Sequence, residues 1–101
     1  KISIRLKMEL EKLLNYVGKS TFIKYLELFE NNNIENKDII SEIEEDYTLN
    51  SKNSRTSKAR RILREYGLKE ILINILHSKK LDEDIKSKAR KRLNKFSSQS
   101  D

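Results

Sequence analysis

An arginine-rich stretch, residues 54–67, repeats polar side chains at the spacing of one helical face. The members of that face are Ser57, Arg60, Arg61 and Arg64. At about 100° per residue these positions project from the same side of a helix. A guanidinium offers a fork of donors that matches a phosphate or the edge of a guanine. The pattern favours contacts to nucleic acid, and the alternative is a solvated helix whose arginines only pair with acidic neighbours.

The opposite side of this stretch carries the apolar residues that would hold such a helix in place. They are Ala59, Ile62, Leu63 and Tyr66, at i, i+3, i+4 and i+7, which is typical of one buried stripe. Ser54 or Ser57 can cap the start of the helix, and Gly67 fits a left-handed position just past its end. We therefore expect a helix over residues 54–66.

The remaining charges are segregated along the chain. Residues 27–46 hold eight acids against one base, whereas residues 52–64 and 86–95 hold six bases each and no acid. With a net charge of +6 and a pI near 9.6, this polarity favours a polyanionic partner. The candidate nucleic-acid-binding residues are Lys52, Arg55, Ser57, Lys58, Arg60, Arg61, Arg64, Lys88, Lys91 and Lys95.

Composition indicates an all-α protein, because the 101 residues include two glycines and no proline. We expect one compact bundle of about six short helices over residues 1–96, followed by a disordered tail at 97–101. The expected helices cover about 6–17, 21–31, 36–46, 54–66, 68–77 and 82–96, and the apolar 68–77 segment is expected at the centre. Alternating apolar residues before Leu10 also fit a strand, which would have nothing to pair with. Gly18 is expected to end the first helix and Ser20 to cap the second.

Two DNA-binding arrangements resemble parts of this pattern. Residues 36–66 resemble a helix-turn-helix unit, with two short helices of which the second exposes arginines. Their connector, residues 47–53, is longer than the usual 3–4 residues and lacks a glycine, unless the second helix begins near Ser51. Residues 20–29 and 55–63 resemble segments of the small helical arm with which tyrosine recombinases grip DNA.

Few residues suit catalysis or cofactor binding, so we expect no enzyme, no metal and no cofactor. Gly18-Lys19-Ser20-Thr21 is not a phosphate loop, because Leu13 stands where that motif needs its first glycine. Cysteine is absent and His77 is the sole histidine. The carboxylates of Glu42, Glu45 and Asp46 are close in sequence, as on an ordinary solvated helix face.

The compartment follows from what the sequence lacks. No apolar run is long enough for a membrane span, no secretory signal is recognisable, and the absence of cysteine suits a reducing compartment. We expect a cytoplasmic protein that does not bind membranes. The lysine-rich 82–96 segment could lie on an anionic membrane, but its apolar face is narrow and lacks tryptophan.

The sequence thus predicts a DNA-binding domain that places the 54–66 helix on duplex DNA, backed by the 82–96 helix. The alternative is a helical protein-interaction or oligomerisation module whose acidic 27–46 face docks a basic surface, such as a second copy. RNA binding is a third hypothesis, but most aromatic residues fall on buried stripes, which favours a duplex over stacked single-stranded bases. Since the chain does not begin with methionine, we expect it to come from a larger protein.

Overall fold

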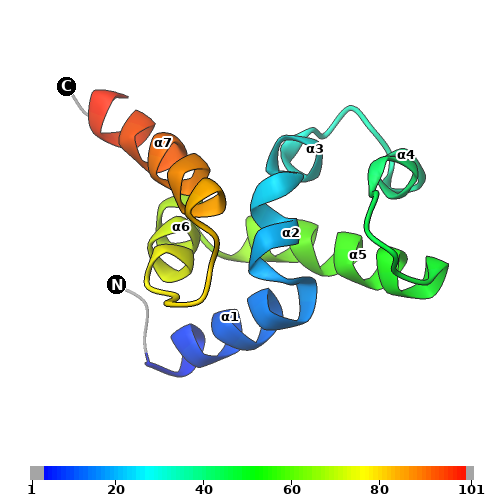
Figure 1. Ribbon diagram of the computed structural model, residues 1–101, viewed down its shortest axis with the longest axis horizontal. Helices are drawn as coiled ribbons and strands as arrows, with labels where there is room; N and C mark the ends of the chain where they lie inside the picture. The colour runs from blue at the N-terminus through cyan, green and yellow to red at the C-terminus, as the bar shows by residue number, and fades with distance from the viewer. Residues whose placement is uncertain (1–3, 100–101) are drawn as a thin grey trace.

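Seven α-helices make up the fold in the computed structural model, which describes residues 4–99 (Figure 1). They are α1 (Ile4–Val17), α2 (Lys19–Lys24), α3 (Leu26–Glu30), α4 (Asn36–Glu42), α5 (Leu49–Glu65), α6 (Leu68–Leu76) and α7 (Glu83–Gln99). The described residues contain no strand. The all-α prediction and the helical bundle are therefore confirmed.

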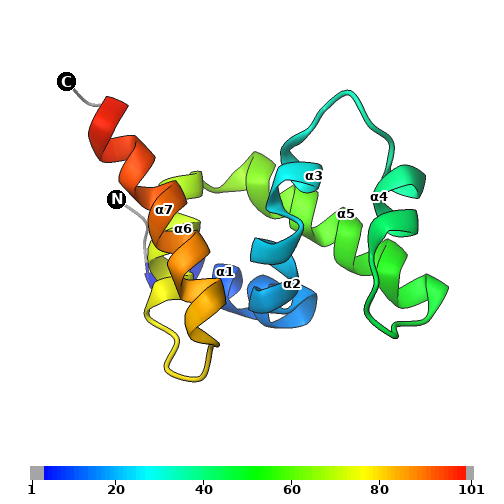
Figure 2. The same cartoon turned by 45° about the horizontal axis from the view of Figure 1, so that its top comes forward.

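The central element is α5 rather than the apolar 68–77 segment. Helix α5 packs against α1, α3 and α4, while α6 packs mainly against α7, which also contacts α2. Figures 1 and 2 both place α4 and α7 at opposite ends of the molecule. The expected central helix, now α6, therefore belongs to a pair at one side of the fold.

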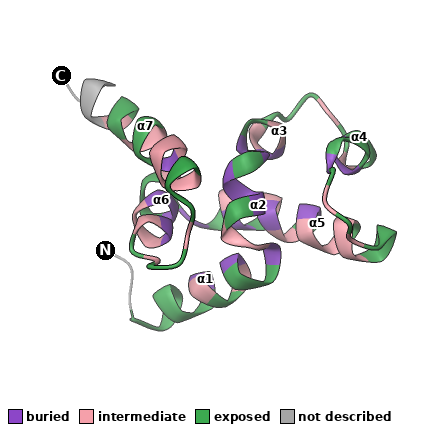
Figure 3. Ribbon diagram, viewed as in Figure 1, coloured by how far each residue is buried: buried purple, intermediate pink, exposed green. Residues whose placement is uncertain are grey.

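Every helix contributes a fully buried apolar side chain to one core. Examples in chain order are Leu14, Phe22, Leu26, Ile39, Ile62, Leu72 and Ala89. The exposed positions of α1, α4, α5 and α7 turn outward (Figure 3). On α5 the predicted stripe is confirmed at Ala59, Ile62 and Tyr66, with Leu63 partly buried.

The segment predicted as one helix over 21–31 is broken at Tyr25. This residue has φ −110° and ψ 22°, and its buried phenol binds the segment after α4 instead of continuing a regular turn. Gly18 has φ +92°, a backbone conformation that disfavours side chains, so its role at the end of α1 is confirmed. Ser20 does not cap the next helix, because α2 begins one residue earlier, at Lys19.

The helix that carries the arginines begins earlier than predicted. Thr48, rather than Ser54 or Ser57, caps α5 by accepting a hydrogen bond from the Ser51 amide at 3.1 Å. Because α4 ends at Glu42, the connector between α4 and α5 is residues 43–48.

Two helix ends near the C-terminus also differ from the prediction. Gly67 has φ −70° and ψ 141°, so it is an extended residue before α6 and not a left-handed cap. Helix α7 continues to Gln99, so much of the segment predicted as a disordered tail is helical. Residues 100–101 of that tail lie outside the described range.

Candidate nucleic-acid interface

Arg60 holds the loop between α3 and α4 and is not free to read bases. Its Nη2 donates to the carbonyl oxygens of Asn31 at 2.8 Å and Ile34 at 3.0 Å, and its Nη1 donates to Asn36 Oδ1 at 2.8 Å. Charged donors of this kind are the stronger class of hydrogen bond. Arg60 is therefore half-buried and bound to the α3–α4 loop, so the prediction that its side chain is exposed is wrong.

Arg55 also has a structural role, and its side chain is not exposed as predicted. Its Nη1 donates to the carbonyls of Tyr16 at 2.9 Å and Val17 at 2.8 Å, which end α1. The guanidinium lies 3.8 Å from the centroid of the Tyr47 ring. A cation at a helix C-terminus satisfies unpaired carbonyls and the negative end of the dipole.

The two lysines predicted on α5 are also engaged by the protein. Lys52 Nζ donates to the carbonyl of Ile43 at 3.0 Å, at the end of α4. Lys58 Nζ lies 4.8 Å from the centroid of the Tyr16 ring, and its side chain is half-buried. Lys52, like Arg55 and Arg60, therefore fixes the position of α5 and is not a free phosphate contact.

A continuous row of polar side chains remains exposed on the outer face of α5, and we call it the polar stripe. It consists of Asn50, Asn53, Ser57, Arg61 and Arg64. Ser57, Arg61 and Arg64 were predicted there, whereas Asn50 and Asn53 were missed because the helix was expected to begin after them. At 1.5 Å per residue the stripe runs about 21 Å along the helix axis.

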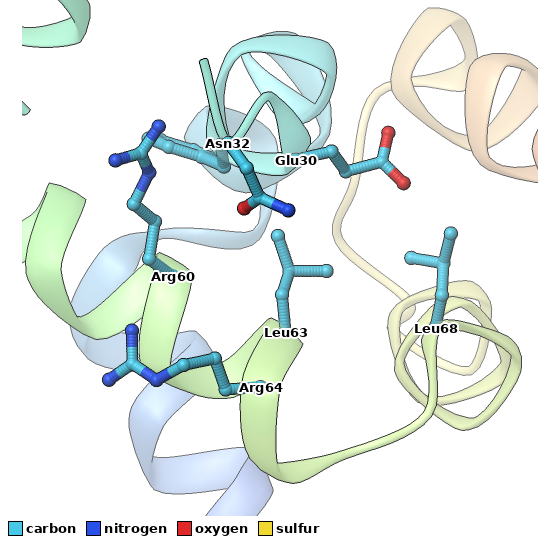
Figure 4. A pocket seen from close by; sticks show the side chains of 7 residues that line it. Glu30, Asn32, Arg60, Leu63, Arg64 and Leu68 are labelled. Carbon is cyan, nitrogen blue, oxygen red and sulfur yellow. The ribbon is translucent and has the colours of Figure 1, made fainter. Parts of the chain in front are cut away.

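The two arginines of the polar stripe are the cations of α5 most available to a partner. Arg61 Nε pairs with Glu65 at 3.1 Å, but both side chains are about half exposed, and exposed pairs of this kind contribute little. Arg64 has no bonding partner among the side chains described by the structure, residues 4–96. It lines a hollow of about 430 Å³ between α3, α5 and α6, with Leu63 and Asn32 beside it (Figure 4).

The predicted basic residues of α7 fall into two groups, those hydrogen-bonded within the protein and those exposed. Lys88 Nζ donates to the Lys24 carbonyl and to Glu27 Oε1, both at 3.1 Å, so it already has two acceptors within the protein, and its contact with the DNA backbone stays a prediction. Lys91 and Lys95 are exposed and unpaired in the described structure. Arg92 is bound as well, because Nη2 donates to Glu30 at 2.9 Å, and this hydrogen bond raises the pKa of the guanidinium.

The same contacts neutralise part of the acidic 27–46 segment. Burial alone would raise the pKa of Glu27, but its hydrogen bond from Lys88 and the nearby Arg92 outweigh that effect and lower it. Glu45 accepts from the Tyr25 hydroxyl at 2.7 Å and from Lys24 Nζ at 3.0 Å. Six acids of the segment are still exposed, namely Glu27, Glu35, Asp38, Glu42, Glu44 and Asp46.

Other chemistry is sparse in the described part of the chain. Residues 4–99 contain no group of three or more acidic or histidine side chains placed to hold a metal ion. Within the same range, the helices are too short or too polar to cross a membrane. Comparison with protein-family models, curated proteins and solved structures finds no match for this chain.

Proposed function

We propose that this chain binds duplex DNA by laying the polar stripe of α5 in the major groove. The observation that carries the proposal is the stripe itself, five exposed polar residues along about 21 Å. That length matches about six base pairs at 3.4 Å each, and the major groove is wide enough to admit a helix. Asparagine amides pair with adenine and arginine guanidinium groups with guanine, so the stripe has the chemistry to read both kinds of base pair.

The rest of the fold supports this use of α5 by holding the helix rigidly. Arg55 ties it to the end of α1, Lys52 to the end of α4, and Arg60 to the loop before α4. A helix that is already fixed loses less conformational entropy when a partner binds. Arg55 and Arg60 therefore hold α5 in a fixed position, from which Arg61 and Arg64 can contact a partner. In this proposal α4 and α5 form the helix-turn-helix-like pair.

Duplex DNA suits this surface better than RNA does. The major groove of A-form RNA is too narrow and deep for side chains to read. Single-stranded RNA is bound by stacking bases on exposed aromatic rings, whereas Phe22, Tyr25 and Phe29 are buried. Tyr16 is exposed, but the cations of Arg55 and Lys58 already lie against its ring. We propose binding rather than catalysis, in the cytoplasm, where a chain without cysteine suits the reducing conditions.

The test begins with selection of a preferred site from random duplexes, followed by binding assays on that site and on random duplex. Arg64→Ala should weaken binding to the preferred site by roughly fivefold to 150-fold, the equivalent of about 1–3 kcal/mol, and should affect random duplex much less. Arg5→Ala is the charge-matched control, because Arg5 is exposed on α1, which packs on another side of α5. It should lower both affinities slightly and equally.

Two results would overturn the proposal. One is the absence of duplex binding at low salt. The other is that Arg64→Ala and Asn53→Ala, like the control Arg5→Ala, each lower the affinity for the preferred site and for random duplex by the same factor. Either result would turn attention to the exposed acids around α4 as a surface for a basic protein.

A further inference from the structure

A hollow of about 580 Å³ lies beside the first turn of α5, at the edge of the polar stripe. Its lining residues are Lys37, Ile40 and Ser41 from α4, and Leu49, Lys52 and Asn53 from α5. Asn53 belongs both to this lining and to the polar stripe. The hollow is therefore continuous with the surface that we propose faces DNA.

The apolar residue at the mouth of this hollow is not explained by the fold. Leu49 is 67% exposed, whereas Ile40, which lines the same hollow, is 8% exposed and belongs to the buried set. Thr48 supplies the cap of α5, so the helix does not need a leucine at its first position. An exposed leucine beside a buried isoleucine leaves an apolar contact site in a surface that is otherwise polar.

The charges around the hollow favour an anion. Lys37 is exposed and has no bonding partner in the described part of the chain. The acids of α4, Asp38 and Glu42, do not line the hollow. Lys37 and Ser41 are four residues apart and share one face of α4, while Asp38 and Glu42 share the next.

The major-groove edge of DNA has one apolar group, the 5-methyl of thymine, and a phosphate backbone beside it. We propose that Leu49 and Ile40 receive a thymine methyl group while Lys37 contacts a neighbouring phosphate. This inference rests on the proposed function and makes Leu49 a specificity-determining residue. The thymine belongs to the part of the site that the amides of Asn50 and Asn53 read, where A·T pairs are expected.

Uracil substitution tests the inference, because it removes the methyl group and keeps the base pair. Thymines of the selected site are replaced one at a time, and the affinity of the intact protein is measured for each duplex. At one or two positions uracil should weaken binding about fourfold, the equivalent of about 0.8 kcal/mol for one buried carbon. Leu49→Ala should bind thymine and uracil duplexes equally at those positions.

Arg64→Ala is the matched control, since it alters a distant part of the same stripe. It should weaken every duplex and keep the uracil penalty. If the protein binds its site specifically but uracil has no effect, or if Leu49→Ala retains the full penalty, the inference is wrong and the proposed function stands. If the hollow instead binds an apolar side chain of an acidic protein segment, specific DNA binding should show no effect of uracil.

Absence of any sequence-specific duplex binding would overturn the proposed function itself, and the inference with it. Because the Leu49 side chain is exposed, Leu49→Ala should keep the helix content and melting temperature of the parent. Equal circular dichroism spectra of the two proteins would show that a lost uracil penalty is not a folding defect.

Discussion

Arg60 and Arg64 lie one helical turn apart on α5, yet only Arg60 donates hydrogen bonds to other parts of the described chain. The guanidinium of Arg60 donates to backbone carbonyls of the loop between α3 and α4, whereas that of Arg64 has no acceptor among residues 4–96. Figure 4 shows both side chains extending from the same side of α5. Two identical residues at helical spacing thus have separate roles, one in stability and one in the proposed binding.

Arg60→Ala should therefore destabilise the fold, and Arg64→Ala should not. Losing a charged donor leaves the Ile34 carbonyl without a hydrogen bond and the Asn31 carbonyl with only the long one from the Ile34 amide at 3.4 Å, so we expect the free energy of unfolding to fall by about 2 kcal/mol. An exposed residue without contacts should change it by about 0.5 kcal/mol or less. Urea unfolding measures both values, and similar values for the two variants would contradict the separation of roles.

The helical stripes could be predicted from sequence because they depend on local periodicity. Ala59, Ile62 and Tyr66 are buried as their spacing indicates. The sequence favoured a start of α5 at residue 54, with a start near Ser51 only as the alternative, because Asn50, Ser51 and Asn53 are poor helix formers. Tertiary contacts outweigh that propensity here, since the Lys52 ammonium is bound to the end of α4. The only local signal was Thr48, a good cap.

The roles of the basic residues could not be predicted, because their acceptors are distant in the sequence. Arg55 binds carbonyls 38 and 39 residues earlier, and Lys88 binds Glu27, 61 residues earlier. Charge runs in a sequence show how many cations there are, but only the packing of α5 and α7 shows which ones are used internally. Of the ten predicted site residues, Ser57, Arg61, Arg64, Lys91 and Lys95 remain exposed.

Thr56 carries a buried hydroxyl that the fold does not use. The residue is fully buried on α5, and its Oγ1 has no hydrogen-bond partner among the described residues. Burying an unpaired polar atom costs free energy, so Thr56→Val, which keeps the shape, should raise the free energy of unfolding by about 1 kcal/mol. Thr56→Ser, which keeps the hydroxyl and removes the methyl, should lower it. Thermal melts of both variants provide the check, and a destabilised valine variant would reveal a partner for the hydroxyl.

Glu45 should make the fold sensitive to acid. Burial alone would raise the pKa of Glu45, but hydrogen bonds from Tyr25 and Lys24 outweigh it and hold the pKa below its ordinary value. A carboxyl whose folded pKa is depressed stabilises the protein above its unfolded pKa, near 4.3, and this contribution disappears as pH falls through the folded value.

Glu45→Gln should thus lower the melting temperature at pH 7 and approach the parent as both are acidified below about pH 4. The contacts at stake join α2 to the α4–α5 connector, and their loss should cost about 1 kcal/mol at pH 7. Glu42→Gln is the control, because Glu42 is exposed and forms no ion pair within the described range. A constant difference between Glu45→Gln and the parent at all pH values would contradict the prediction.

The salt dependence of DNA binding should separate the exposed lysines of α7 from the bound one. Each phosphate that a lysine neutralises contributes about 0.9 to the slope of log K against log salt. Lys91 and Lys95 are exposed, so replacing either with alanine should make the slope shallower by about that amount. Lys88→Ala should leave the slope nearly unchanged, because its ammonium is already held by Lys24 and Glu27.

These three variants also decide whether α7 touches DNA at all. Helix α7 packs on α6 and α2, and it lies at the other end of the molecule from α4 (Figure 2). If none of the three variants changes the slope while Arg64→Ala still weakens specific binding, α5 alone contacts the duplex. If Lys88→Ala makes the slope shallower, Lys88 leaves Glu27 on binding, and the pairing of α7 with α2 and α3 changes when DNA is bound.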